Sequence, residues 1–260
     1  MQSQPVSVVV PTYNERGRIE RLVTEVFSSL AAAGLLGEMV VVDDNSPDGT
    51  GALADELSAR FPLKTVHRAG KLGLGGAVME GFAVAEGELL AVLDGDLSHP
   101  PAAIPDLVAA LHGLGVDMAV GSRYIPGGRW RNWPRKRWLM SRVACLMARP
   151  LTPVRDAMSG LFVLRRDAVE GVRIASAGFK IGLELQMRGR VRSVAEVPYT
   201  FTDRESGSSK MSTREGVNYL AQLSILYRLR LAGGTRPPRY HRVTPGELET
   251  LRAQSARRRT

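Results

Sequence analysis

Two aspartates separated by a single glycine, Asp94 and Asp96, follow directly after the apolar run LLAVL. Two carboxylates this close repel each other, and a hard divalent cation with oxygen ligands relieves that repulsion. The alternative is a polar turn in which Asp96 caps the helix that follows. The spacing therefore predicts either a metal site or a capping turn, and the surrounding elements must decide between them.

A second acidic pair, Asp43 and Asp44, ends the apolar run MVVV. A carboxylate at such a position can accept hydrogen bonds from a ribose or from the N–H group of a base. For Asp48 and Thr50, which follow closely, a turn or capping role is the simpler interpretation. Two acidic strand ends in one sheet indicate one shared cleft.

The glycine-rich segment GKLGLGGA, which contains Lys71, could be mistaken for a phosphate-binding loop. It lacks the GxxxxGKS or GxxxxGKT order of such loops. We predict instead a loop that lies over a bound ligand, with Lys71 near a phosphate group.

The elements that must position these residues alternate regularly through the first 121 residues. Short apolar runs rich in β-branched residues predict buried strands, and the segments between them have the pattern of helices. This alternation predicts an α/β fold, with a Rossmann-like, mostly parallel sheet and helices on both faces. Ligands bind such sheets beyond the carboxyl ends of the strands, where both acidic pairs stand. The predicted strands are 6–10, 39–42, 64–67, 89–93 and 118–120, and the predicted helices are 19–33, 50–60, 73–85 and 101–111.

The pattern loosens after Tyr124, where a stretch rich in Gly, Trp and Arg leads into a helix predicted to end near Arg149. Residues 1–232 are predicted to form one domain, and residues 233–260, rich in Pro and Arg, a flexible tail. The further predicted strands are 161–164 and 191–197, and the further predicted helical segments are 167–172, 181–188 and 213–231.

Charge is unevenly distributed along the 260 residues, whose net charge is +9. Residues 1–120 carry 7 Lys and Arg against 16 Asp and Glu, whereas residues 121–260 carry 28 against 10. The acidic half is therefore suited to cations and the basic half to anions. Cys145 is the only cysteine, which excludes a disulfide framework and favours a reducing, cytoplasmic setting. No stretch has the roughly 20 apolar residues of a membrane-spanning helix.

All three tryptophans, Trp130, Trp133 and Trp138, fall within nine residues and are interleaved with basic residues. Such a pattern can stack on single-stranded nucleic acid, or can seat a protein at a membrane interface on anionic lipids. Packing of one or more rings in the core is the third possibility. We favour membrane contact for residues 126–150, because nucleic-acid binding leaves both acidic clusters unexplained.

An ordered set of motifs resembles the family 2 inverting glycosyltransferases of GT-A fold, over about residues 5–230. Within that family the chain most resembles the dolichol-phosphate and polyprenol-phosphate mannose synthases. The motifs are SVVVPTYNE, VVVDDNSPDGT, KLGLGGA, LDGDLSHPP, VGSRY, D-x-x-SG from Asp156, EVP and DRxxGxSKM.

The resemblance implies a donor side of the site. Asp94 and Asp96 match the DxD motif, which binds Mg²⁺ or Mn²⁺ against the donor's diphosphate. Ser98 stands where many relatives have a Gln that can help to ligate the metal, so the third protein ligand stays open. The residues implied to bind the nucleotide sugar are Pro11, Tyr13, Glu15, Asp43, Asp44, Lys71, Asp94 and Asp96.

The resemblance also implies an acceptor side, for a polyprenyl phosphate whose oxygen is the nucleophile. A phosphate monoester with a second pKa near 6 is largely ionised at neutral pH, so a strong general base is dispensable. Asp156 matches the place where relatives with hydroxyl acceptors keep a base, and here it is implied to orient an arginine or the sugar. The implied catalytic residues are Arg123, Asp156, Arg204 and Lys210, and the implied ligands of the acceptor phosphate are Arg123, Arg137 and Ser141.

The function implied by the resemblance is inverting transfer of mannose from GDP-mannose to polyprenyl or dolichyl phosphate. Transfer from UDP-glucose is the alternative within the family, and a basic nucleic-acid-binding protein on a degenerate transferase fold is the alternative outside it.

A polyprenyl chain stays in the bilayer, so we expect a peripheral protein on the cytoplasmic face of a membrane, with a membrane-anchoring partner protein as a further hypothesis. The amphipathic helix 213–231 is a candidate docking surface, with core packing as its alternative. We expect no nucleic-acid partner.

Overall fold

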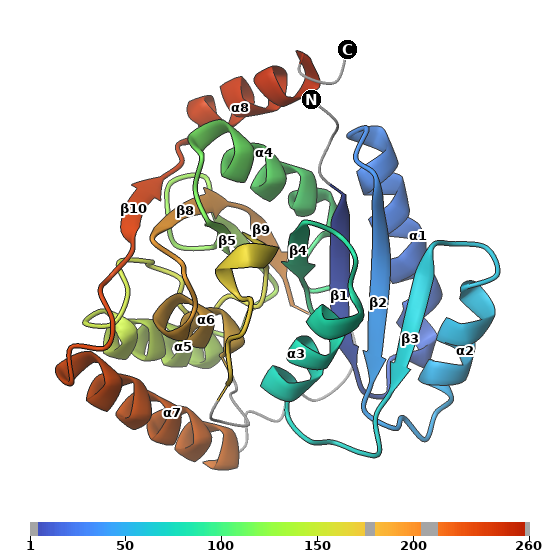
Figure 1. The fold of residues 1–260 in the computed structure, drawn as a ribbon, viewed down its shortest axis with the longest axis horizontal. Helices are drawn as coiled ribbons and strands as arrows, with labels where there is room; N and C mark the ends of the chain where they lie inside the picture. Colours follow the sequence, from blue (N-terminus) through green and yellow to red (C-terminus); the bar gives the residue numbers. More distant parts are fainter. Residues whose placement is uncertain (1–4, 175–179, 204–212, 258–260) are drawn as a thin grey trace.

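A mostly parallel sheet with helices on both faces forms the centre of the molecule (Figure 1). The computed structural model describes residues 5–174, 180–203 and 213–257. Within these residues the sheet has eight strands in the order β10-β8-β5-β7-β4-β1-β2-β3, and β6 pairs with β9 in a separate ribbon. The strands are β1 (Val6–Thr12), β2 (Gly37–Asp43), β3 (Leu63–His67), β4 (Leu89–Val92), β5 (Met118–Ser122), β6 (Arg129–Arg131), β7 (Phe162–Arg165), β8 (Ser193–Pro198), β9 (Thr200–Thr202) and β10 (Arg239–Arg242).

The predicted α/β architecture is confirmed. Every strand and helix predicted in the first 121 residues forms within three residues of its expected ends, because β-branched runs give strands buried on both faces. The helices at 181–188 and 213–231 also form as predicted. The helices are α1 (Arg16–Ala32), α2 (Thr50–Leu57), α3 (Leu74–Val84), α4 (Ile104–Leu114), α5 (Arg135–Ala148), α6 (Ile181–Arg188), α7 (Thr213–Leu231) and α8 (Pro245–Arg257), with short 3-10 turns at Pro101–Ala103 and Arg166–Ala168.

Strand β7 lies between β4 and β5 and runs antiparallel to both. Its residue Val163 is the register partner of Ala91 on one side and of Ala119 on the other. Because β7 is reversed, its first residues stand at the edge where its neighbours end. The D-x-x-SG segment that precedes β7 is therefore delivered to the same edge as the DGD and GSRY segments.

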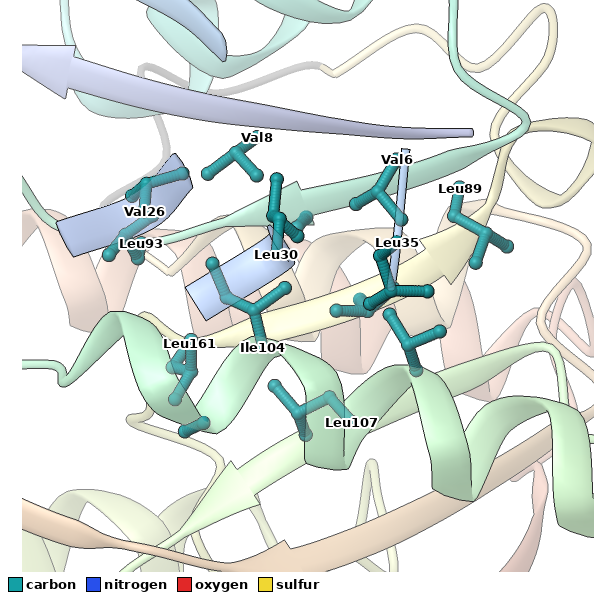
Figure 2. Packing of buried hydrophobic residues seen from close by; sticks show 14 of the residues in the cluster. Val6, Val8, Val26, Leu30, Leu35, Leu89, Leu93, Ile104, Leu107 and Leu161 are labelled. Atoms are coloured by element: carbon teal, nitrogen blue, oxygen red, sulfur yellow. The ribbon is translucent and has the colours of Figure 1, made fainter. Parts of the chain in front are cut away.

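Two apolar layers fix the sheet between its helices. In one layer, Val8 of β1, Leu30 of α1 and Leu107 of α4 lie in the same buried cluster (Figure 2). The layer on the opposite face contains Val78 of α3 and Leu185 of α6. Burial of each such side chain contributes about 1.5–3 kcal/mol, so the strand ends project from a rigid base. A third cluster joins α5, α6 and α7.

The prediction of a flexible tail from residue 233 is wrong. Strand β10 extends the sheet by parallel pairing with β8, and α8 packs on α4, as Figure 1 shows. Leu248 and Leu251 of α8 are buried, and Arg252 forms a two-pronged ion pair with Asp106 of α4 at 2.6 and 2.7 Å. The segment is rich in Pro and Arg, but its few apolar residues are spaced so that they pack against α4. This packing is enough to hold α8 in place.

Replacing Leu251 with Ala should lower the free energy of unfolding by about 2–4 kcal/mol, because it opens a cavity between α8 and α4. The side chain fits closely against α4, where a Cβ added to Gly113 would lie 2.3 Å from Leu251 Cδ2. Urea unfolding measures the change, with the exposed Gln254→Ala as the matched control. Equal unfolding midpoints for both variants would show that α8 does not pack as described.

Candidate active site

A pocket of about 570 Å³ lies at the carboxyl edge of the sheet and unites most of the predicted site residues. The ends of β1, β4 and β5 contribute to its wall, together with α5, the segment before β7 and the start of α7. Of the two acidic strand ends expected to share one cleft, the end of β4 with Asp94 and Asp96 lines this pocket, whereas Asp43 and Asp44 at the end of β2 do not. The predicted site residues that line it are Pro11, Tyr13, Glu15, Lys71, Asp94, Asp96, Arg123, Arg137 and Ser141.

The two aspartates of the DGD segment both reach this pocket. Asp94 is partly exposed, with 41% of its side-chain surface accessible, and its Oδ2 lies 3.1 Å from Nε2 of His99. Asp96 is buried, and its Oδ1 accepts a hydrogen bond of 3.0 Å from the amide of Ser98. A Cβ on Gly95 would lie 3.2 Å from Thr12 Cγ2, so glycine lets the end of β4 approach β1 closely. Asp96 therefore accepts a hydrogen bond within the local turn, and both Asp94 and Asp96 also line the pocket.

This donor set fits a divalent cation that shares its ligands with a substrate. Among the described residues, no group of three or more His, Cys, Asp and Glu side chains is arranged to hold a metal ion. Mg²⁺ is commonly held by one or two carboxylates, with phosphate oxygens and water completing the coordination. Asp94 and Asp96, with the buried Ser98 beside them on the pocket wall, match that requirement.

The expected donor residues divide into two groups. Tyr13 and Lys71 both line the pocket and contact each other, with Nζ of Lys71 over the Tyr13 ring at 4.5 Å from its centre. Asp43 and Asp44 stand at the end of β2 but are not among the residues that line the pocket. Asp43 accepts hydrogen bonds from Thr12 and Ser46, and Asp44 pairs with the buried Arg68.

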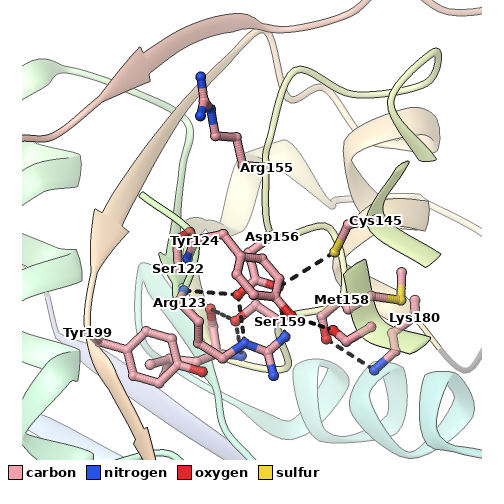
Figure 3. Close-up of polar contacts among 12 residues, drawn as sticks. Ser122, Arg123, Tyr124, Cys145, Arg155, Asp156, Met158, Ser159, Lys180 and Tyr199 are labelled. Atoms are coloured by element: carbon pink, nitrogen blue, oxygen red, sulfur yellow. Dashed lines mark hydrogen bonds and ion pairs between the residues drawn. The ribbon is translucent and has the colours of Figure 1, made fainter. Parts of the chain in front are cut away.

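Arg123 is the most constrained side chain of the pocket. Its Nε and Nη2 each donate to the carboxylate of Asp156 at 2.7 Å, and its backbone amide donates to the same group at 3.0 Å (Figure 3). The guanidinium carbon lies 4.5 Å from the centre of the Trp133 ring and 5.1 Å from that of Phe201. Burial alone would lower the pKa of Arg123, but the charge and hydrogen bonds of Asp156 raise it above its ordinary value. The guanidinium therefore stays charged.

Asp156 itself is fully buried and does not line the pocket. Its backbone amide donates to Glu196 at 2.8 Å, which anchors the segment to β8. Of the roles that the sequence left open, orientation of an arginine is the one that these contacts match. A carboxylate committed to Arg123 and shielded from the pocket is not placed to accept a proton from a substrate.

The remaining acceptor-side residues come from α5. Arg137 Nη1 lies 2.5 Å from Oδ2 of Asp203, and Ser141 accepts a hydrogen bond of 2.9 Å from the hydroxyl of Tyr124. Both Arg137 and Ser141 line the pocket. Arg204 and Lys210 lie outside the described residues.

Lys180 is a pocket residue that sequence reasoning missed. Its ammonium group donates to the carbonyl of Met158 at 3.1 Å, and burial lowers the pKa of the side chain (Figure 3). The backbone amide of Lys180 donates to Oε1 of Gln222 in α7 at 3.2 Å, and Nε2 of Gln222 donates to the backbone carbonyl of Lys180 at 3.3 Å. A single lysine before an apolar helix belongs to no motif that would indicate a site residue. Only the fold brings Lys180 within electrostatic range of Asp94 and Arg123.

The three tryptophans have different surroundings. Trp133 lines the pocket and packs against the core, whereas Trp130 is 41% exposed and its ring centre lies 6.0 Å from that of Trp138. Core packing therefore describes Trp133, and Trp130 remains available at the surface.

Comparison with known proteins places the chain in a family. The model of glycosyl transferase family 2 matches residues 7–173. A dolichol-phosphate mannosyltransferase of Pyrococcus furiosus is 43% identical over 228 residues, covering 86% of this chain and 63% of that protein. A dolichol-phosphate mannosyltransferase of Saccharomyces cerevisiae is 39% identical, with 85% and 86% covered, and a polyprenol monophosphomannose synthase of Mycolicibacterium smegmatis is 39% identical, with 89% and 91% covered. The chain thus spans less than two thirds of the Pyrococcus relative.

Solved structures agree on the fold. A glucosyl-3-phosphoglycerate synthase from Mycobacterium tuberculosis, in complex with Mn²⁺, UDP and phosphoglyceric acid, superposes with a TM-score of 0.62 at 24% identity, covering 87% of this chain and 78% of that one. A mannosyl-3-phosphoglycerate synthase from Rubrobacter xylanophilus gives a TM-score of 0.64 at 20% identity, with 90% and 76% covered. The predicted GT-A architecture is confirmed, and the chain belongs to glycosyl transferase family 2.

Proposed function

We propose that this protein transfers mannose from GDP-mannose to polyprenyl or dolichyl phosphate, with inversion at the anomeric carbon and with Mg²⁺ or Mn²⁺ as cofactor. The observation that carries the proposal is a single pocket that holds the Asp94 and Asp96 carboxylates together with the Arg123 and Arg137 guanidiniums. The first pair suits a metal-bound diphosphate and the second an acceptor phosphate. The names of the three relatives support the sugar and the acceptor class.

On the donor side, Asp94 and Asp96 would hold the metal, while Tyr13, Glu15 and Lys71 line the part of the pocket assigned to the nucleotide. A bound divalent cation would stabilise the charge that develops on the leaving diphosphate.

On the acceptor side, the nucleophile is an already ionised phosphate oxygen, so the protein has to position it and not to deprotonate it. Arg123, fixed by Asp156, and Arg137, on α5, would bind that phosphate. The oxygen attacks the anomeric carbon as the bond to the diphosphate oxygen breaks, and the bonding electrons leave with the diphosphate. An α-linked donor then gives a β-linked product.

An apolar face formed by α5 and α7 supports peripheral membrane attachment. The two helices adjoin, because Tyr219 and Tyr227 of α7 donate hydrogen bonds to carbonyls of α5. Both helices also contribute to the pocket, so this face lies next to the acceptor side. The exposed apolar residues, here called the apolar face, are Leu139, Met140, Val143, Leu146 and Met147 of α5, with Val217, Leu220, Ile225 and Leu231 of α7.

The surroundings of this face suit anionic lipid. Arg135, Lys136, Arg142 and Arg149 of α5 and its cap carry positive charge beside the apolar residues. A basic residue near an anionic membrane surface contributes about 1 kcal/mol. In helix α7, Tyr219 and Leu223 pack inward while Val217 and Leu220 are exposed, which supports the proposal of a docking surface on this helix. None of the described helices has the length and apolarity to cross a bilayer.

The donor and the metal are tested together. With polyprenyl phosphate in detergent, the protein should form a mannolipid from GDP-mannose only when Mg²⁺ or Mn²⁺ is present. Asp96→Asn should lower kcat at least about 100-fold, because several kcal/mol of charge stabilisation is lost. The exposed Asp55→Asn, outside the pocket, is the matched control. Glucolipid from UDP-glucose alone would overturn the donor, and binding of single-stranded RNA without any lipid product would favour the nucleic-acid alternative.

The Arg123–Asp156 pair is tested by a double-mutant cycle. Asp156→Asn should cost about 3–5 kcal/mol of stability, because it leaves Arg123 buried without its counterion, and should raise KM for polyprenyl phosphate more than KM for the donor. The double variant Arg123→Met with Asp156→Asn should recover most of the stability but none of the activity. Urea unfolding and steady-state kinetics read the two effects separately. An unchanged acceptor KM in Asp156→Asn would refute the positioning role.

The apolar face is tested by flotation with anionic liposomes. The double variant Leu146→Asn with Leu220→Asn should weaken liposome binding at least about tenfold, because each buried Leu side chain contributes about 1.5–3 kcal/mol. Transfer to a short-chain polyprenyl phosphate in detergent should be retained. Leu36→Asn changes an equally exposed leucine far from α5 and α7 and is the control. Equal flotation of all three proteins would exclude this face as the attachment surface.

A further inference from the structure

His99 connects the pocket to a buried tyrosine. Its Nε2 lies 3.1 Å from Oδ2 of Asp94, and its Nδ1 lies 2.9 Å from the hydroxyl of Tyr199. Both rings are almost fully buried, with 2% and 6% of the residue exposed. Tyr199 stands between β8 and β9, so a segment 100 residues away along the chain reaches the DGD turn through one imidazole.

Both ring nitrogens of His99 have a hydrogen-bonding partner. An ionised Asp94 can only accept a hydrogen bond, so Nε2 must donate to it. Burial raises the pKa of the Tyr199 phenol above its ordinary value, so the hydroxyl keeps its proton and can donate to Nδ1. His99 therefore links the Tyr199 hydroxyl to the Asp94 carboxylate through its two ring nitrogens.

The surrounding atoms hold this arrangement in place. The ring of Phe201 meets the His99 ring edge-on, with ring centres 5.6 Å apart. A Cβ added to Gly160 would lie 3.0 and 3.1 Å from the two Asp94 oxygens and 3.2 Å from Nε2 of His99. Glycine at the end of the D-x-x-SG segment therefore leaves the space that the carboxylate and the imidazole occupy.

We propose that His99 is a positioning residue for Asp94, that the Tyr199 hydroxyl holds the imidazole in place, and that Gly160 provides the space, so that the Asp94 carboxylate is preorganised for a divalent cation. This inference rests on the metal use in the proposed function. Groups that orient a metal ligand in this way typically change metal affinity by 10- to 100-fold when they are removed. The contact also gives a shared role to His99 and Gly160, to which the donor and acceptor assignments gave none.

The test is the dissociation constant of Mn²⁺ in the presence of GDP, measured by electron paramagnetic resonance on the full chain. His99→Leu should weaken Mn²⁺ binding about 10- to 100-fold. His99→Gln keeps an N–H donor toward Asp94 and should stay within about threefold of the original protein, and Tyr199→Phe should fall between the two. Binding of GDP without metal should change less than about twofold in all of them.

Gly160→Ala provides an independent arm that leaves the imidazole intact. It should weaken Mn²⁺ binding about tenfold or more by displacing the carboxylate, whereas Gly17→Ala, at a position with open space, should not change it. Thermal melting of each variant separates metal affinity from stability, because a purely structural role would lower Tm and leave the Mn²⁺ constant unchanged.

The possible failures are distinguishable. If the original protein binds GDP but no Mn²⁺ or Mg²⁺, the metal part of the proposed function fails and this inference fails with it. If the original protein binds Mn²⁺ and His99→Leu, Tyr199→Phe and Gly160→Ala bind it equally well, the positioning role is refuted and the proposed function stands. If His99→Leu does not fold, Tyr199→Phe and Gly160→Ala decide the matter alone.

Discussion

Charges of both signs stand in one pocket of this protein and have to be kept from neutralising each other. Direct pairing of Arg123 with Asp94 would remove a proposed acceptor-phosphate ligand and a proposed metal ligand in one contact, and the weak screening of a buried site would favour that pairing. Asp156 prevents it by occupying the Arg123 guanidinium with two hydrogen bonds of 2.7 Å from a fully buried position. Asp203, which lines the pocket, pairs with Arg137 through one contact of 2.5 Å.

The reversed strand β7 makes this separation possible. Because β7 runs antiparallel between β4 and β5, the segment from Asp156 to Gly160 arrives between the DGD turn and the GSRY segment. One end of that short segment supplies the counterion of Arg123, and the other end leaves space for the Asp94 and His99 pair. The helices that carry the apolar face border the same pocket, so the proposed lipid phosphate would reach Arg123 without its chain leaving the membrane.

Much of this arrangement could be predicted from local pattern. Buried parallel strands have a strong signal, and polar residues at their ends indicate the site, so the sheet and the DGD turn were accessible from sequence. The signals that failed are the long-range ones. The contact of His99 with Tyr199 spans 100 residues, and the backbone of Lys180 is hydrogen-bonded to Gln222 of α7, 42 residues away. Strand β10 and α8 were not predicted, because they contain few apolar residues and are stabilised by pairing with β8 and packing on α4.

In the proposed site, one pocket separates a metal-bound diphosphate at Asp94 and Asp96 from an acceptor phosphate at Arg123 and Arg137. A crystal structure of the protein with GDP, Mn²⁺ and a short-chain polyprenyl phosphate tests it most directly, because anomalous scattering locates the metal. We expect the Mn²⁺ peak between the two aspartates and the lipid phosphate on the two arginines. A metal site elsewhere, or both phosphates bound at the same end of the pocket, would contradict it.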